Sequence, residues 1–213
     1  EILDKIRMLR SHGLVGASAG DLWRGEERWA YEQLDLGFHY RMTDIQAALG
    51  SAQMDRAARI VEERRMLAAR YDQALASISW LGLPEAPEGY EHGYQSYPCL
   101  FMPEETIKAI QTCENNALVK ICEMRNAWMD KLQEKGVSTR PATHAVHMLS
   151  YYKGKYGHGA TDFPNAFAAN NCSVSIPLFH GMTEGELEFV VEAIGYGIQR
   201  TVDALQLRPV VEQ

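Results

Sequence analysis

Apolar residues recur at helical spacing over the most regular part of the chain, from residue 44 to about residue 77. Thr43 and Gln46 stand at its start as a capping box, in which each side chain satisfies the other residue's backbone N–H. The pattern predicts one long helix of roughly nine turns at ~3.6 residues per turn. The residues that define its apolar face are Ile45, Leu49, Ala52, Ile60, Leu67, Tyr71 and Leu75.

The rest of this predicted helix is strongly charged. A run of charges of both signs along a helix is usually a solvated face, and that is our interpretation here. The charged residues are Arg56, Arg59, Glu62, Glu63, Arg64 and Arg65.

The chain before this helix is less regular. A short apolar period predicts a helix over residues 1–11 that ends before Gly13. Residues 14–37 show no clean period and predict a long loop, a kind of segment that is usually functional or disordered. Trp23 and Trp29 argue against disorder, because aromatic residues are rare in segments that bury nothing.

Strands and helices are predicted to alternate after a turn-rich connector that runs from Pro84 to Gly93. Near the end of the chain, Thr183 and Glu186 form a second capping box. The predicted elements are a strand over 94–102, two helices within 103–135 broken near Asn115-Asn116, a turn into a strand over 136–141, an aromatic and glycine-bearing loop over 148–161, a helix over 165–170, a strand over 173–178 and a helix from Thr183 to about residue 205.

This order of elements places the second half in the α/β (α+β) class, with few strands and several covering helices. The first half is nearly all helix and loop, and it lacks the run of buried strands that a complete doubly wound domain shows.

Composition excludes several classes of function. The net charge of −7 argues against general nucleic-acid binding, which favours a basic face. No apolar run reaches the length of a membrane span. The four cysteines show no CxxC spacing, and we interpret them as reduced thiols of a cytoplasmic protein.

An aromatic and basic cluster precedes the long helix: Phe38, His39, Tyr40 and Arg41. Neither a core segment nor a plain loop alternates rings with basic groups in this way, so the cluster predicts a surface that contacts a ligand or partner. The guanidinium of Arg41 suits a phosphate or a carboxylate. Alternatively, Arg41 pairs with Asp44 at the start of the helix.

His144 and His147 form an HxxH pattern with three interpretations. A metal site would need a third ligand, and no acidic residue stands at a helpful offset, so we disfavour metal binding. A structural histidine and a polar contact to a ligand hydroxyl or phosphate remain open. The patterns GxSxG, GxxxxGK[ST] and GxGxxG are absent, which disfavours a hydrolase triad or a phosphate-loop enzyme.

Several longer motifs occur together in one order and spacing: LRSHG at 9–13, GFHYRMTDIQAALG at 37–50, GVSTRPATHAVHMLSYY at 136–152, DFPNAF at 162–167 and SIPLFHGMTEGEL at 175–187. They resemble the C-terminal half of the DegT/DnrJ/StrS-type sugar aminotransferases, which are pyridoxal-phosphate enzymes of the aspartate-aminotransferase fold. The resemblance runs along nearly the whole chain, except for residues 104–123.

The resemblance implies a domain plan. Residues 1–43 would be the end of the large cofactor-binding domain with an interface loop, and residues 44–83 a long interdomain helix and connector. Residues 84–213 would be the small α/β domain, whose short sheet is mainly antiparallel. Members of the family act as dimers, so we expect a homo-oligomer.

The resemblance also implies a reaction, the transfer of an amino group from glutamate to a keto sugar carried on a nucleotide. In the family, the Schiff-base lysine lies in a glycine-rich segment about twenty residues before the LRxHG motif. Only eight residues precede Leu9 here, so we expect this chain to be a fragment, inactive alone and without bound cofactor. The alternative is a naturally truncated module for dimerisation or ligand binding.

Site residues follow motif by motif. His39, where the family has Asn, and Arg41 would contact the cofactor phosphate of the neighbouring subunit, and Tyr40 would line the same cleft. His147 matches a substrate-contacting histidine of the family, and His144 would compensate for a second one that is Ala142 here. Loss of the large domain would expose apolar surface on the helix over 44–77, which predicts self-association.

Overall fold

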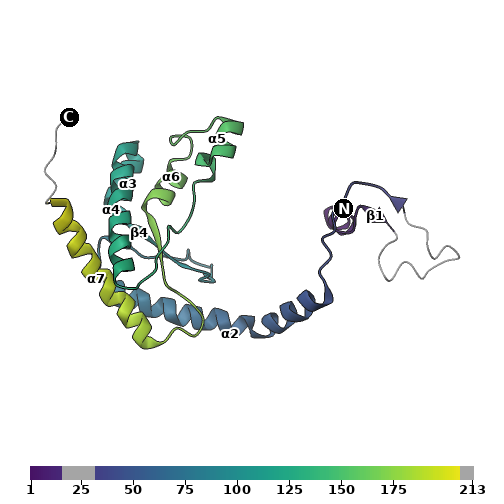
Figure 1. Ribbon diagram of the computed structural model, residues 1–213, viewed down its shortest axis with the longest axis horizontal. Coiled ribbons are helices and arrows are strands. Elements are labelled where there is room, and N and C mark those ends of the chain that lie inside the picture. Colours follow the sequence, from purple (N-terminus) through teal and green to yellow (C-terminus); the bar gives the residue numbers. More distant parts are fainter. Residues whose placement is uncertain (16–31, 207–213) are drawn as a thin grey trace. The chain divides into compact units, whose positions relative to one another are not determined.

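The computed structural model describes residues 1–15 and 32–206, with side chains described as far as Tyr196 (Figure 1). The chain divides into two compact units, residues 1–57 and residues 58–213, and each is described by itself. In the described part of the chain, no helix combines the length and the apolar character that a membrane span requires.

The first unit contains α1 (Ile2–Leu9), β1 (Leu14–Val15), β2 (Glu32–Gln33) and the first turns of α2 (Asp44–Leu75). The predicted first helix is confirmed and ends two residues early. β1 and β2 pair antiparallel inside the segment that we predicted as a loop. Trp23 and Trp29 lie outside the described residues.

The long helix α2 begins where the capping box predicts. The N–H of Thr43 donates to Gln46 Oε1 at 3.1 Å, and the N–H of Gln46 donates to Thr43 Oγ1 at 3.3 Å. The predicted apolar face is buried only in the second half of the helix, at Leu67, Ala68, Tyr71 and Leu75. Its first half is exposed, which agrees with the apolar surface that we expected there: Ile45 is 84% and Leu49 63% exposed.

The interpretation of the charged run as a solvated face is wrong at Arg64 and Arg65. Arg64 Nη1 donates to the carbonyls of Tyr94 and Gln95, each at 2.9 Å. Arg65 Nε donates to the carbonyl of His92 at 3.1 Å. These two guanidinium groups satisfy carbonyls of residues 92–95 that no strand satisfies, so they hold the end of the connector and the residues after it against α2.

The second unit contains a three-stranded antiparallel sheet in the order β3-β4-β5, made of β3 (Leu81–Gly82), β4 (Tyr97–Phe101) and β5 (Ser173–Ile176). Along β4, Tyr97, Cys99 and Phe101 are buried in the alternating pattern of a strand that faces a core. The strands predicted over 94–102 and 173–178 are confirmed with shorter bounds. The sequence reading missed β3.

The strand predicted over 136–141 is wrong. Within this segment only Arg140 pairs with the sheet, as an isolated bridge to Ser175. The N–H of Arg140 donates to the Ser175 carbonyl at 3.2 Å, and the Arg140 carbonyl accepts from the Ser175 N–H at 2.7 Å. Pro141 follows, and proline has no N–H to donate, so the ladder stops there.

Helices cover the sheet (Figure 1). The two helices predicted within 103–135 are confirmed as α3 (Pro103–Gln111) and α4 (Asn115–Glu134). The predicted short helix is confirmed as α6 (Pro164–Cys172), and the predicted last helix as α7 (Glu184–Gln206). At the start of α7, the N–H of Thr183 donates to Glu186 Oε2 at 2.7 Å, as the second capping box predicts.

The loop predicted over 148–161 is wrong, because it contains η1 (Val146–Met148) in part and the whole of α5 (Ser150–Tyr156). Gly154 lies inside α5, where a glycine costs only about 1 kcal/mol relative to alanine. Gly157 ends the helix with φ +73°, the left-handed conformation that glycine tolerates best.

The core of the second unit is aromatic. Trp128 of α4 is fully buried, and its ring centroid lies 5.4 Å from that of Trp80 and 5.6 Å from that of Phe101. Its indole N–H donates to the carbonyl of Ile194 in α7 at 3.4 Å. Trp128 therefore joins the sheet to two of the helices that cover it.

Candidate functional site

The first unit brings together two motifs that lie more than twenty residues apart. The N–H of Phe38 donates to the carbonyl of Leu9 at 2.8 Å, and the N–H of His12 donates to the carbonyl of Phe38 at 3.0 Å. The N–H of Tyr40 donates to the carbonyl of Arg10 at 2.9 Å. The end of α1 and the segment that carries the aromatic and basic cluster are thus paired through backbone hydrogen bonds.

Two glycines make this close pairing possible. A Cβ atom on Gly37 would lie 2.2 Å from the backbone nitrogen of Gly13, and one on Gly13 would lie 1.8 Å from the carbonyl oxygen of Asp35. Gly13 also has φ +77°, where other residues are strained. Each motif therefore contains a glycine for the same reason: any side chain there would separate the two segments.

The cluster itself is presented on the surface. Phe38, His39, Tyr40 and Arg41 are all exposed, and the rings of Phe38 and Tyr40 stack at 5.1 Å between centroids. Among the ion pairs of the described residues, none joins Arg41 to Asp44, so the structure gives no support to the pairing that we considered. Imidazole and guanidinium donors at a surface can hold a phosphate.

His12 is a neighbour of the site that the sequence reading missed. Its ring lies edge-on to that of His39, with centroids 4.9 Å apart and an interplanar angle of 86°. The sequence did contain a signal for His12, because this residue belongs to the LRSHG motif. Only the backbone pairing, however, shows that this motif lies next to His39.

In the second unit, His147 and His144 differ in their surroundings. His147 lies on η1 and is only 9% exposed, and its Nε2 has no hydrogen-bond partner in the described structure. A buried polar atom of this kind is uncommon and is a candidate ligand contact. His144 is exposed three residues earlier. Among the described residues, no group of three or more metal-ligand side chains comes together.

Hydrogen bonds from α6 hold the segment before His147. The side-chain oxygen of Asn170 accepts from the N–H of Ala145 at 3.0 Å. Arg125, buried in α4, donates to the carbonyls of Asn170 at 3.1 Å and Ser173 at 2.7 Å. A cation at the C-terminal end of α6 also interacts favourably with the helix dipole. Arg125 and Asn170 thereby fix the segment from which His147 projects.

Phe163 connects His147 to a polar turn. The centroid of its ring lies 5.0 Å from that of His147 and 5.0 Å from that of His158. His158 Nδ1 lies 3.5 Å from Asp162 Oδ2, which also accepts from the N–H of Gly159 at 2.8 Å. The hydrogen bond from Gly159 first, and then the interaction with His158, hold the pKa of Asp162 below its usual range.

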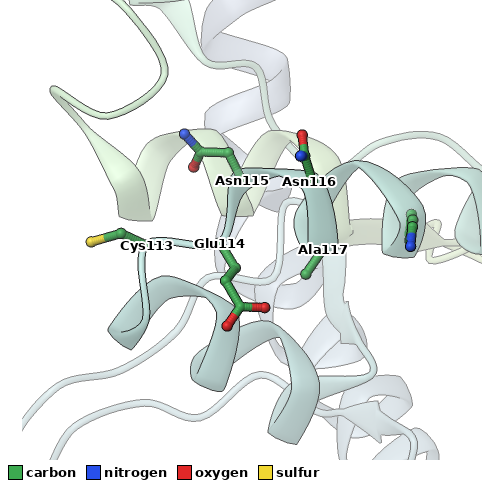
Figure 2. Close-up of a pocket in the computed structure, with 6 residues that line it drawn as sticks. Cys113, Glu114, Asn115, Asn116 and Ala117 are labelled. Carbon is green, nitrogen blue, oxygen red and sulfur yellow. The ribbon is translucent and has the colours of Figure 1, made fainter.

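Two hollows of the second unit lie away from these residues. One, of about 470 Å³, lies between α3 and α4 around Cys113 and Glu114. Figure 2 shows that the side chains lining it point in different directions, so they do not converge on a ligand. The other, of about 540 Å³, is lined by residues of 136–138, by the segment before α7, which includes Phe179, and by the start of α7, which includes Phe189. Neither contains a residue that the sequence predicted for the site.

Comparison with known proteins agrees with the motifs. The model of the family described as DegT/DnrJ/EryC1/StrS aminotransferases matches residues 1–195. The chain is 31% identical over 194 residues to the spore coat polysaccharide biosynthesis protein SpsC of Bacillus subtilis, an alignment that covers 91% of this chain and 46% of that protein.

Solved structures show the same fold. The aminotransferase TlmJ from Streptoalloteichus hindustanus aligns with a TM-score of 0.70 and 24% identity, over 92% of this chain and 45% of that one. Spr1654 from Streptococcus pneumoniae, in its apo form, aligns with a TM-score of 0.76 and 20% identity, over 95% of this chain and 44% of that one. The chain thus spans less than half the length of the relatives it matches.

Proposed function

Because the chain belongs to the DegT/DnrJ/EryC1/StrS aminotransferase family, we propose that it is the C-terminal half of an enzyme that uses pyridoxal phosphate to transfer an amino group from glutamate to a nucleotide-linked keto sugar. The observation that carries the proposal is the backbone pairing of the two motifs, which presents His39 and Arg41 at the surface. Spr1654 supports the choice of cofactor, since its solved structures include pyridoxal-phosphate and pyridoxamine-phosphate forms.

The cofactor would supply an electron sink for the amino transfer, and the residues of this chain would bind and orient. His39 and Arg41 would hold the cofactor phosphate of a neighbouring subunit, and the guanidinium of Arg41 would suit a bidentate contact. Tyr40 lines the same cleft. His147 offers its unpaired Nε2 to a substrate hydroxyl or phosphate oxygen, and the exposed His144 adds a second contact.

The chain alone is proposed to be inactive. A lysine that forms a Schiff base needs a lowered pKa, which burial or a neighbouring cation provides. None of the seven lysines of the chain is buried, including Lys153 and Lys155 on α5. We expect borohydride reduction with added pyridoxal phosphate to trap no stoichiometric adduct. A stoichiometric adduct on one lysine would overturn this part of the proposal.

The decisive test compares this chain with the native gene product. The reading frame before the codon for Glu1 is sequenced, and the intact mass of the native protein is measured. A frame that continues through a glycine-rich lysine segment, with a mass near double and one lysine trapped by borohydride in the native protein, supports the proposal. A frame that begins at Glu1 overturns it.

A second candidate is a module for dimerisation or ligand binding, and the exposed apolar residues of the first unit favour it. Ile2, Leu36, Phe38 and Ile45 are each more than half exposed. Apolar patches of this kind are usually covered by a partner. Light scattering at low micromolar concentration is expected to show a homodimer or larger oligomer, and a clean monomer would contradict this candidate.

A further inference from the structure

His12 occupies a backbone position where glycine is usual. It follows the end of α1 and has φ +64°, in the left-handed region that favours glycine. The N–H of Gly13 donates to the carbonyl of Met8 at 3.0 Å, so the chain turns back over the last turn of α1 as it does in a Schellman motif. Glycine at position 12 would adopt this turn without strain. The histidine side chain therefore needs an explanation other than the turn itself.

The backbone of His12 is held from two sides. Its N–H donates to the carbonyl of Phe38 at 3.0 Å, and its carbonyl accepts from Gln33 Nε2 at 3.3 Å. Both partners lie more than twenty residues further along the chain. The left-handed conformation is thus fixed by tertiary hydrogen bonds, which is the circumstance in which a strained backbone persists and in which strain often marks a functional site.

This conformation decides where the side chain of His12 lies. Ser11 and His39 form an isolated antiparallel bridge, so the side chain directly opposite His39 is that of Ser11. Neighbouring side chains of an extended segment point to opposite faces, so an extended His12 would point away from His39. With its left-handed backbone, His12 instead places its ring edge-on to that of His39, with the centroids 4.9 Å apart.

The two paired segments, residues 9–13 and 37–41, carry basic groups and no acidic residue. Their charged or titratable side chains, apart from the phenol of Tyr40, are Arg10, His12, His39 and Arg41. In a chain of net charge −7, a surface of this composition favours an anion. An imidazole that turns freely directs an N–H toward the anion only part of the time. Holding the ring therefore raises the affinity without adding a contact.

We propose that His12 is a positioning residue, whose ring holds the imidazole of His39 in the orientation in which an N–H of His39 meets the phosphate group of the cofactor. His12 acts through His39 and does not itself contact the phosphate. This inference rests on the proposed function, in which His39 and Arg41 hold that phosphate. It adds the residue that sets the orientation of His39, and it gives the LRSHG motif a role in the site.

The test is an NMR titration of the whole chain, in which the imidazole signals of His39 are followed as inorganic phosphate or pyridoxal phosphate is added. Pyridoxal, which lacks the phosphate, is the control ligand. His12→Gly is expected to raise the Kd for both phosphate ligands about threefold to tenfold, the range that one ordinary hydrogen bond covers. The amide-exchange protection of Gly13 is expected to remain, because glycine adopts the left-handed backbone without strain. A purely structural role for His12 would not weaken the site while the turn stays intact.

Three further variants sharpen the test. His12→Phe keeps a ring beside His39 and is expected to bind within about twofold of the wild-type chain. In the background of His39→Ala, His12→Gly is expected to cause no further loss, because His12 acts only through His39. The matched control is Cys113→Gly, since Cys113 also has a left-handed backbone, with φ +57°, and belongs to the second unit. Its Kd is expected to be unchanged.

Three results would overturn the proposal: His39 signals that phosphate does not move, wild-type affinity in His12→Gly, or an effect of His12→Gly that adds fully to that of His39→Ala. An equal loss of affinity in His12→Phe and His12→Gly would show that His12 contacts the phosphate itself, which also contradicts a positioning role. If His12→Gly loses the amide protection, His12→Asn takes its place, because asparagine also tolerates the left-handed backbone.

These titrations need neither a Schiff-base lysine nor amino transfer, so their outcome is independent of the reading-frame and borohydride tests. A frame that begins at Glu1 would overturn the proposed function, and the titration with inorganic phosphate would still decide whether His12 positions His39.

Discussion

The second unit buries Trp128, Tyr71, Tyr97 and Phe101 completely, whereas the described residues of the first unit bury only Gly13. The second unit thus has a hydrophobic core of its own, which is the main source of stability in a folded domain. The first unit is ordered by backbone hydrogen bonds between two close segments. The difference is the reason why we propose that the exposed apolar side chains of the first unit contact a partner.

The sharpest way to test this contrast is to remove a large side chain from each unit. Trp128→Ala is expected to lower the free energy of unfolding by about 3–5 kcal/mol, because it leaves a cavity among Trp80, Phe101 and α7. Leu49→Ala, at a 63% exposed position of the first unit, is expected to change it by less than about 0.5 kcal/mol. Chemical denaturation measures both, and equal effects would contradict the contrast.

The next largest effect is expected at the buried cation. Arg125→Met removes the donors to the carbonyls of Asn170 and Ser173, and a buried acceptor left without a partner costs about 1–3 kcal/mol. Denaturation measures the loss. The imidazole signals of His147 in an NMR spectrum are expected to shift as well, because Asn170 holds the segment before it. Unchanged His147 signals would contradict a positioning role for Arg125.

The two capping boxes offer a matched comparison of smaller size. Thr183→Ala removes the cap of α7, whose Leu187, Val190 and Ile194 are buried, and is expected to cost about 1 kcal/mol of global stability. Thr43→Ala removes the same kind of cap from the exposed start of α2. It is expected to fray the first turn, seen as faster amide exchange, with little change in the denaturation midpoint. Equal shifts of the midpoint would show that the start of α2 belongs to the cooperative core.

The smallest effect is a pH dependence. The folded pKa of Asp162 lies below its unfolded value, chiefly because the carboxylate accepts from the N–H of Gly159. The stability that this carboxylate adds to the folded state is therefore fully present above the unfolded pKa of about 3.9, and it is lost as the pH falls through the folded pKa. Asp162→Asn is expected to be slightly less stable than the wild-type chain at pH 7, and this difference is expected to disappear once the pH falls below the folded pKa of Asp162. Thermal melts across this range measure the difference, and a gap that does not depend on pH would contradict the assignment.

The helices and strands that the sequence predicted correctly all carry local signals. The caps at Thr43 and Thr183, the alternation along β4 and the break between α3 and α4 each depend on residues a few positions apart. The errors occurred where a local signal was misleading. Gly154 and the nearby glycines indicated a loop, but the tyrosine pairs and the glycine at position 157 make α5 a helix with a defined end.

For the candidate site, the sequence identified the residue types but not their surroundings. The motifs named His39, Arg41 and His147 as candidates. That His12 contacts His39, and that the Nε2 of His147 is buried without a partner, depends on the backbone pairing in the first unit and on the packing of Phe163 in the second. Neither feature has a pattern in a single stretch of sequence.

By itself, then, the sequence determined the helical and strand periods, the capped helix starts, the family and the presence of glycine at positions 13 and 37. Tertiary structure alone decided why those glycines are needed, since each one faces the backbone of the other segment. It also decided the roles of Arg64 and Arg125, whose backbone-carbonyl partners lie at least 30 residues away. Helices, strands and caps depend on residues a few positions apart. These contacts, by contrast, form only when folding brings distant segments together and one supplies the hydrogen-bond partners that buried polar groups of the other require.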